Sequence, residues 1–466
     1  MAAGRTAWTR LAAGALTIAG LALLGGCAHA PLNQPLARYD QRAGFRYAPP
    51  ATGKSEVVVL LFFSGGGMRA AALSYGVLRE LAATQVATAG GSHRLLDDVE
   101  IISAVSGGSF TAAYYALNRD RTFTDYETRF LKRDVHGALV SRLLLPTEWP
   151  ALASTYYGRS DLAADYYDRK VFDRATFGDL VRAGNRPLLL INATDMANGE
   201  QFAFSQVRFD LIGSDLSTFP LARAVAASSA TPLLLTPITL QNHAGKPGAV
   251  QSAFLPATVD ESTLPERTRE IRRVFRSYTD AQERPFIHLV DGGLSDNLGL
   301  RGIMDAALLN GGISGLADRI GMPQARRFVV IVVNAATKRG AEWTKSEAVP
   351  GIWRSIDQLG DNVGQQVNRH TLELFRQLLD EWRREARYRF AMQPDSRQDS
   401  PDYYLVNLGF DQLADREERQ FLQNLPTRLH LAPDTIDRLT TAGGRLLQES
   451  PEFRRLLEET KAEAAR

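Results

Sequence analysis

The chain has 466 residues, of which 23% are charged and 44% are hydrophobic, and its formal net charge is +2. This composition is typical of a folded globular protein and excludes a chain that is disordered throughout. Nothing in the charge balance indicates a nucleic-acid-binding protein, which would need a clustered basic surface. The length predicts one large α/β domain with insertions, or one domain with a smaller helical unit.

Residues 1–26 have the pattern of a signal peptide. Arg5 and Arg10 precede the run LAAGALTIAGLALL, which is too short to span a membrane comfortably. The run leads into Leu-Gly-Gly-Cys, which resembles the lipobox of bacterial lipoproteins, and Cys27 is the only cysteine of the chain. The alternatives are an ordinary signal peptide and an N-terminal anchor helix. We expect a lipoprotein of the bacterial cell envelope, held at the membrane surface by a lipid on Cys27. Because Ala28 follows and not aspartate, we expect the outer membrane.

Residues 27–54 are rich in Pro, Ala and Gly without any period, which predicts a tether. Beyond them, apolar runs alternate with segments of helical spacing. The runs predict strands at 57–63, 99–105, 187–194, 238–242, 286–291 and 327–335. This alternation predicts an α/β fold with a mostly parallel central sheet that helices cover on both faces.

Three segments depart from this alternation. Residues 120–185 carry many aromatic and charged residues and predict a helical insertion, which would be an acyl-binding cover, a membrane-facing lip or an ordinary subdomain core. Residues 243–283 are polar and weakly periodic, and we expect a long surface excursion there. Residues 341–466 predict a mainly helical C-terminal extension with one strand near 402–410.

The turn after the first predicted strand reads Ser-Gly-Gly-Gly-Met-Arg. Its glycines, Gly65, Gly66 and Gly67, leave backbone N–H groups uncovered at the start of a helix, where they can bind an anion. No Gly-Lys-Ser/Thr follows, so the turn is not a P-loop. It predicts either an anion-binding turn or a sharp corner.

The turn after the strand at 99–105 begins with Ser106, followed by Gly107 and Gly108. A serine between a strand and a helix can be a nucleophile whose Oγ stands above the sheet, and a helix-capping serine is the alternative. The usual nucleophile elbow is G-x-S-x-G. Gly108 matches its second glycine, and we assign Ser103 to the position of the first.

The third turn, Val-Asp-Gly-Gly, ends the strand predicted at 286–291 and contains Asp291. We expect this strand to be parallel to its neighbours, so that Asp291 at its C-terminal end points into the crevice where open α/β sheets bind ligands. An Asx-turn at a strand end is the alternative.

In this order, G-G-G-x-R, x-x-S-G-G and D-G-G resemble the patatin-like phospholipase family, and AVAASSATPLLL at 224–235 resembles the family's segment between the serine and the aspartate. The resemblance spans about residues 56–335. It implies a three-layer α/β/α catalytic domain, which we place at 55–340. It also implies a serine acyl hydrolase that cleaves ester bonds of membrane lipids without any cofactor.

The resemblance implies roles for individual residues. Ser106 would be the nucleophile of an acyl-enzyme mechanism, and Asp291 would be the general base. The N–H groups of Gly65, Gly66 and Gly67, aided by Gly107, would form the oxyanion hole. Arg69 would support this loop or attract a lipid phosphate, and a surface arginine is the alternative.

The alternatives to this interpretation are one other catalytic mechanism and two other functions. A Ser-Asp-His triad needs a histidine after the acid, and only His370 and His430 follow Asp291, both in charge-rich helical sequence. His288 precedes Asp291 by three residues, so on an extended strand its side chain points to the opposite face. The sequence contains no cluster typical of a metal site. A non-catalytic lipid-binding or assembly lipoprotein on the same fold is the other alternative, and acyl transfer to an acceptor other than water is a third.

Overall fold

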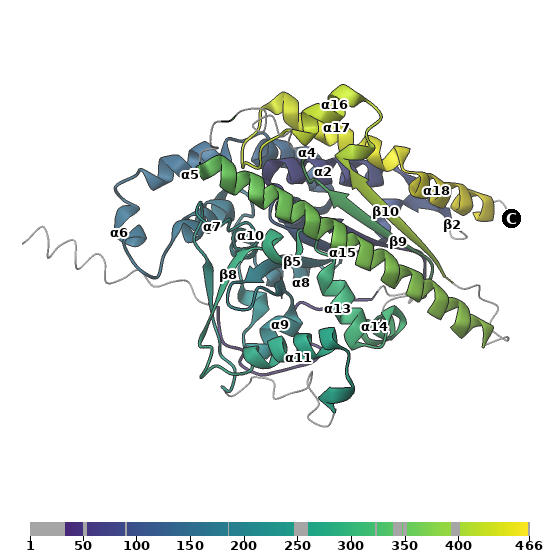
Figure 1. The fold of residues 1–466 in the computed structure, drawn as a ribbon, viewed down its shortest axis with the longest axis horizontal. Helices are drawn as coiled ribbons and strands as arrows, with labels where there is room; N and C mark the ends of the chain where they lie inside the picture. The colour runs from purple at the N-terminus through teal and green to yellow at the C-terminus, as the bar shows by residue number, and fades with distance from the viewer. Residues whose placement is uncertain are drawn as a thin grey trace, which may run out of the picture.

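The computed structural model describes residues 33–49, 54–88, 91–184, 186–246, 260–321, 324–338, 347, 352–392 and 401–464. The predicted signal peptide and Cys27 therefore lie outside the described residues. A central mixed sheet is covered by helices on both faces, as Figure 1 shows. This arrangement confirms the predicted three-layer fold with a mostly parallel sheet.

The sheet has the strand order β10-β9-β1-β4-β5-β8-β7, and β6 lies off this path and pairs with β5. Its strands are β1 (Lys54–Phe63), β4 (Val99–Val105), β5 (Leu188–Asp195), β6 (Gln201–Phe204), β7 (Ile238–Gln241), β8 (Phe286–Asp291), β9 (Gln324–Asn334) and β10 (Asp402–Gly409). The pairs from β10 to β5 are parallel, and β6, β7 and β8 make antiparallel pairs. A separate hairpin joins β2 (Gln85–Thr88) and β3 (Gly91–Arg94).

The apolar run of β1 is continuous because both faces of this strand are buried. Val59, Leu61 and Phe63 pack on one face in a core that includes α2 (Gly67–Ala83), α3 (Gly107–Asn118), α10 (Leu221–Ser228) and α17 (Pro433–Glu449). Leu60 and Phe62 pack on the other face with α13 (Arg301–Leu309), α14 (Ile313–Ile320) and α15 (Ile352–Ala391). No helix among the described residues combines the length and the apolar character that a membrane span requires.

The segment 120–185 is helical. It contains α4 (Thr122–Tyr126), α5 (Val135–Leu143), α6 (Trp149–Leu152), α7 (Arg159–Lys170) and α8 (Phe177–Arg182). Most of its aromatic side chains are core residues: the rings of Phe130 and Tyr167 lie 4.4 and 4.9 Å from that of Phe110 on α3. Trp149 and Tyr156 differ, because they are exposed. The insertion therefore packs into the main core of the domain and keeps an apolar outer edge.

The segment 243–283 is not only a polar excursion. It contains α11 (Glu266–Tyr278), whose buried apolar residues are Ile271, Val274, Phe275 and Tyr278. Two other short helices, α9 (Gln206–Leu211) and α12 (Gly293–Asp296), lie between strands. Residues 247–259 of the predicted excursion lie outside the described residues.

The C-terminal residues are mainly helical, with α16 (Arg416–Gln423), α17 and α18 (Pro451–Ala464), but they are built into the sheet domain. The predicted strand near 402–410 is β10, at the edge of the sheet. Helix α17 packs directly on α2: a Cβ on Gly76 would lie 2.0 Å from Thr440 O, and one on Gly443 would lie 2.4 Å from Leu73 O. These glycines allow the two helix backbones to touch.

The predicted tether is shorter than expected, because residues 33–49 pack on the domain. Asn33 is buried and donates a hydrogen bond to Ser214 Oγ at 2.8 Å. Phe45 is also buried, with its ring 5.3 Å from that of Phe177. Composition predicted a free linker, but these contacts, together with the ion pair of Arg46 with Asp210 and the hydrogen bond of Tyr47 to Glu100, dock the segment.

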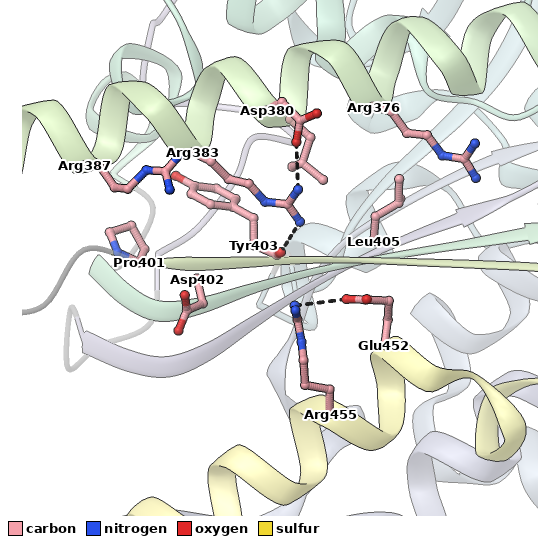
Figure 2. A pocket seen from close by; sticks show the side chains of 11 residues that line it. Arg376, Asp380, Arg383, Arg387, Pro401, Asp402, Tyr403, Leu405, Glu452 and Arg455 are labelled. Atoms are coloured by element: carbon pink, nitrogen blue, oxygen red, sulfur yellow. Dashed lines mark hydrogen bonds and ion pairs between the residues drawn. The ribbon is translucent and has the colours of Figure 1, made fainter.

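A polar groove of about 550 Å³ lies beside the edge strand β10, between α15 and α18 (Figure 2). Arg383 donates hydrogen bonds to Asp380 Oδ1 at 2.8 Å and to the carbonyl of Tyr403 at 2.6 Å. Further along the strand, Gln412 donates to the carbonyl of Asn407 at 2.8 Å. These side chains cover carbonyl groups of the edge strand and so hinder its pairing with a strand of another chain.

Candidate active site

Ser106 stands in a sharp turn between β4 and α3. Its backbone has φ 48° and ψ −120°, a conformation that non-glycine residues rarely adopt. The next residues must be glycines, because a Cβ on Gly107 would lie 2.0 Å from Gly67 O and one on Gly108 would lie 2.7 Å from Ser64 O. The turn is thus held by close contact with the glycine loop that follows β1.

The hydroxyl of Ser106 donates a hydrogen bond to Asp291 Oδ2 at 3.0 Å. The same carboxylate accepts hydrogen bonds from Gly293 N at 2.8 Å, on Oδ1, and from Thr231 Oγ1 at 3.0 Å, on Oδ2. Burial raises the pKa of Asp291 above its ordinary value, and the three hydrogen bonds oppose this shift. The sequence-predicted nucleophile and base are therefore in direct contact.

The expectation that the strand carrying Asp291 is parallel to its neighbours is wrong. Strand β8 runs antiparallel to β5, and Asp291 pairs with Ala193. Val105, just before Ser106, pairs with Asn192, the residue next to Ala193. This register, and not a shared strand direction, brings the two side chains to the same place.

The glycine loop lies beside Ser106, since a Cβ on Gly65 would be 3.3 Å from Ser106 Cβ. One of its predicted oxyanion donors is already engaged, because Gly65 N donates to the carbonyl of Asn297 at 3.1 Å. Gly66 and Gly67 have positive φ angles of 143° and 58°. Within the described part of the chain, the backbone N–H groups of Gly66, Gly67 and Gly107 have no hydrogen-bond partner. These three donors, and not Gly65, are available to an anion.

Arg69 does not face a substrate. Its guanidinium is buried, with Nε donating to Ala335 O and Nη1 to Leu425 O, each at 2.8 Å. Nη2 lies 3.3 Å from Thr427 Oγ1. Met68 N also donates to the carbonyl of Arg428 at 2.8 Å. The C-terminal segment 425–428 therefore holds the glycine loop in place. This geometry favours a role for Arg69 in supporting the loop over a role in attracting a lipid phosphate.

The assignment of Ser103 to the elbow is wrong. The residue two positions before Ser106 is Ala104, which is small and buried. Ser103 lies one position earlier, and its hydroxyl donates to Gly299 O at 2.7 Å and accepts from Asn192 Nδ2 at 2.9 Å. Its side chain therefore fastens β4 to the loop after α12 and does not crowd the turn.

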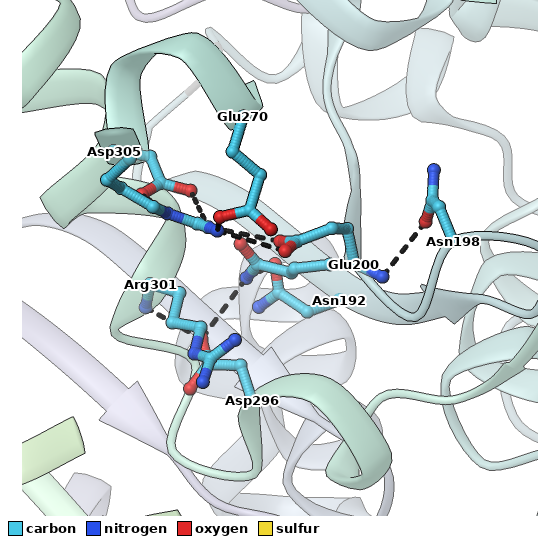
Figure 3. A network of polar contacts seen from close by, with 9 residues as sticks. Asn192, Asn198, Glu200, Glu270, Asp296, Arg301 and Asp305 are labelled. Carbon is cyan, nitrogen blue, oxygen red and sulfur yellow. Dashed lines mark hydrogen bonds and ion pairs between the residues drawn. The ribbon is translucent and has the colours of Figure 1, made fainter. Parts of the chain in front are cut away.

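A buried polar network continues from this point (Figure 3). Gln201 donates to Asn192 Oδ1 at 2.8 Å and to Asp296 Oδ2 at 3.3 Å. Asp296 also accepts hydrogen bonds from Gly299 N at 3.1 Å and Arg301 N at 2.7 Å. Burial raises the pKa of Asp296 to about 6. The network fixes the loop that follows Asp291 through the hydrogen bonds of Asp296 to Gly299 N and Arg301 N.

Three residues that sequence reasoning did not single out support the site. Ser228 Oγ accepts from Ser106 N at 2.8 Å and donates to Asn192 O at 2.6 Å, so it fixes the turn. Thr231 contacts the base, and Asn297 holds Gly65. Ser228 and Thr231 lie in the 224–235 segment noted above, but its pattern does not reveal which hydroxyl makes which contact.

Among the described residues, the hydrogen bonds of Ser106 and Asp291 involve no histidine. His288 is exposed on the sheet and contacts Thr239 Oγ1 at 3.0 Å. His430 lies 3.7 Å from Asp134, and His370 is exposed on α15. No group of three or more potential metal-ligating side chains occurs in the described segments.

Comparisons with known proteins were made for sequence and for structure. The chain is similar in structure to human GIVD cytosolic phospholipase A2, with 12% sequence identity and a TM-score of 0.40. This match covers 88% of this chain and 63% of the human chain. The same enzyme in complex with methyl gamma-linolenyl fluorophosphonate matches at 13% identity, over 88% of this chain and 60% of the other, with a TM-score of 0.39. VipD from Legionella pneumophila matches at 12% identity, over 91% and 71%, with a TM-score of 0.30.

The chain thus spans about three fifths of the length of the human phospholipase chains. No curated protein matches it in sequence. The family model for patatin-like phospholipase matches residues 61–304, which contain all three turns described above. Because this match covers more than half of the 466 residues, the protein belongs to the patatin-like phospholipase family.

Proposed function

We propose that this protein is a serine acyl hydrolase that cleaves acyl ester bonds of lipids, with Ser106 as the nucleophile and Asp291 as the general base. Membership of the family supports lipid hydrolysis as the general activity. The observation that carries the specific proposal is the 3.0 Å hydrogen bond from Ser106 Oγ to Asp291 Oδ2. A nucleophile and its base must lie within this range for proton transfer.

In the proposed reaction, Ser106 Oγ attacks the ester carbonyl carbon while its proton passes to Asp291. The negative charge that develops on the carbonyl oxygen is stabilised by the N–H groups of Gly66, Gly67 and Gly107. The ester C–O bond then breaks, and Asp291 returns the proton to the leaving alcohol. Water attacks the acyl-Ser106 ester with Asp291 again as base, and this step releases the fatty acid and restores the serine.

The surroundings of Asp291 support its role as base. Burial raises its pKa, so the carboxylate is a better proton acceptor than a solvated aspartate. The absence of histidine contacts to Ser106 and Asp291 among the described residues supports a dyad, and not a triad. The side chain of Ser106 makes no capping hydrogen bond to α3, so its positive φ supports a nucleophile more than a helix cap.

The proposal is tested with Ser106→Ala and Asp291→Asn, assayed on phospholipid and on a soluble short-chain ester. Each variant should lose about 10⁴-fold or more in kcat/KM. A fluorophosphonate probe should label the parent protein and not Ser106→Ala. Ser92→Ala, on the surface hairpin, is the matched control and should behave as the parent. Circular dichroism and thermal unfolding show whether each variant is folded.

A folded parent protein that neither reacts with the probe nor hydrolyses any ester would contradict the proposal. It would favour the non-catalytic lipid-binding or assembly function. Added alcohol in the assay separates hydrolysis from acyl transfer, because transfer yields a new ester.

We also propose that the chain is a lipoprotein of the bacterial cell envelope, attached to the outer membrane by a lipid on Cys27. The support is the sequence of residues 1–28 alone. A labelled fatty acid supplied to an expressing bacterium should be incorporated into the protein, and Cys27→Ser should abolish the label. Fractionation of inner and outer membranes tests the destination.

A further inference from the structure

Large apolar side chains are exposed on the segments that follow Thr231 and Asp291, and on the chain between α5 and α6. We define the apolar rim as Leu144, Leu145, Trp149, Leu233, Leu234 and Leu294, each between 47% and 68% exposed. Soluble proteins rarely expose so many large apolar side chains in one region unless the region binds something. We therefore expect the rim to bind a partner.

One half of the rim is attached to the candidate base. Leu294 belongs to α12, whose first residue, Gly293, donates to Asp291. Leu233 and Leu234 closely follow Thr231, which donates to the same carboxylate. Leu233 has φ 73°, a strained conformation for a leucine, and its side chain is nonetheless presented to solvent. These leucines therefore border the place where an ester would meet Ser106.

The other half of the rim lies between the end of α5 and the start of α6, and its segment is connected to the first half through the start of α7. Ser160 in the first turn of α7 donates to Thr236 Oγ1 and O, at 3.2 and 2.5 Å, and Thr236 closely follows Leu233 and Leu234. Arg142 at the end of α5 donates to Leu162 O at 3.2 Å. In Figure 1, α5, α6 and α7 gather at one end of the molecule. These contacts connect the segments that carry the two halves of the rim.

The charges near the rim favour an anionic surface. Arg133 precedes α5, Arg159 begins α7 and Arg428 touches the glycine loop, and within the described segments none of the three has an ion-pair partner. Of the acids nearby, Glu148 pairs with Arg142 and Asp161 with the buried Arg223, while Asp134 caps α5 and lies 3.7 Å from His430. Unpaired cations around an apolar surface suit a membrane with anionic lipids.

We propose that the apolar rim seats this protein on an anionic lipid bilayer, with Trp149 and the leucines inserted at the level of the headgroups and upper acyl chains. This inference rests on the proposed function, since it supplies the lipid to Ser106 and Asp291. An indole ring suits this position because it has an apolar body and one polar N–H. The rim would thus place the dyad at the level of the ester bonds.

The test uses the full-length protein with Ser106→Ala, which removes turnover, and vesicles of phosphatidylcholine with phosphatidylglycerol. Brominated acyl chains quench a tryptophan that enters the bilayer, and the difference between this protein and the same protein with Trp149→Phe isolates Trp149. We expect Trp149 to be quenched. Leu144→Asp with Leu145→Asp should lower vesicle affinity about tenfold or more, because two inserted apolar side chains are lost.

Tyr388→Asp is the matched control, because Tyr388 is as exposed as Leu144, at 68%, and belongs to α15, which carries no residue of the apolar rim. This control should bind vesicles as the parent does. In the active protein, the double variant should lower hydrolysis of vesicle lipid at least about tenfold relative to hydrolysis of a soluble ester. Vesicles of phosphatidylcholine alone should bind more weakly, and salt should reduce the difference.

Equal fluorescence quenching with and without Trp149 would overturn the inference. So would a dimer in solution that the double variant converts to a monomer, because the rim would then cover a second copy of the chain. A parent protein without esterase activity and without probe labelling would instead contradict the proposed function. The quenching result would still decide the role of the rim.

Discussion

Thr231 offers a direct test of how the site sets the basicity of Asp291. Its hydroxyl donates to Asp291 Oδ2, the oxygen that also accepts the hydrogen bond of Ser106. A donor on the carboxylate favours the ionised form and so lowers the pKa of Asp291. Thr231→Val keeps the shape of the side chain and removes this donor, so the pKa of Asp291 should rise.

The magnitude follows from the contact. A hydrogen bond to a charged group contributes about 1.5–3 kcal/mol, and about 1.36 kcal/mol corresponds to one pKa unit. Thr231 is exposed, so water replaces part of the lost bond and the lower end applies. We expect a shift of about one pKa unit. Because the proposed mechanism needs ionised Asp291, the pH below which activity falls should move upward by the same amount.

The assay is kcat/KM for a soluble ester as a function of pH, which reports the ionisation of the free enzyme. Thr231→Ser retains the hydroxyl and should keep the acid limb of the parent. A Thr231→Val profile that superimposes on that of the parent would refute the reasoning, since Thr231 would then have no influence on the base. A shift toward lower pH would refute its sign.

Three further changes test the supports of the site. Ser103→Gly should lower the free energy of unfolding by about 1–3 kcal/mol without raising turnover, because Gly299 O loses its side-chain donor and Asn192 Nδ2 loses one of its acceptors; urea unfolding and ester kinetics measure both. Gly443→Ala should cost about 1–3 kcal/mol in thermal unfolding, because its Cβ meets α2, whereas Gly444→Ala, whose nearest neighbour is 3.5 Å away, should cost nothing. Arg69→Met should lower both stability and kcat, because the segment 425–428 loses its bonds to the glycine loop; wild-type kcat in a folded variant would contradict this.

Much of the fold was readable because buried strands appear as continuous apolar runs. The strands at 99–105 and 286–291 have the predicted bounds. The short strands β2, β3 and β6 contain no long continuous apolar run and leave no such signal. The direction of β8 depends on how the chain crosses the domain, which no local pattern records. Helix α11 could have been found, since its apolar residues at 271, 274, 275 and 278 have helical spacing within a highly charged segment.

The candidate site was predictable to the level of its three turns and no further. Ser106 and Asp291 stand in motifs, so their types and order identify them. That Gly65 N is engaged by Asn297, and that Thr231 touches Asp291, follows from contacts between residues far apart in the chain. The elbow position of Ala104 is different, because counting two residues back from Ser106 is enough to find it.

The bonds between the glycine loop and segment 425–428 have a consequence for the order of synthesis. A ribosome makes Ser106 and Asp291 well before Arg428, whose carbonyl holds Met68 N, and before Leu425 and Thr427, which hold Arg69. A nascent chain that already contains the serine and the aspartate therefore still lacks the clamp beside them. The glycine loop can therefore be completed only after residue 428 has emerged from the ribosome, which is later than the synthesis of Ser106 and Asp291.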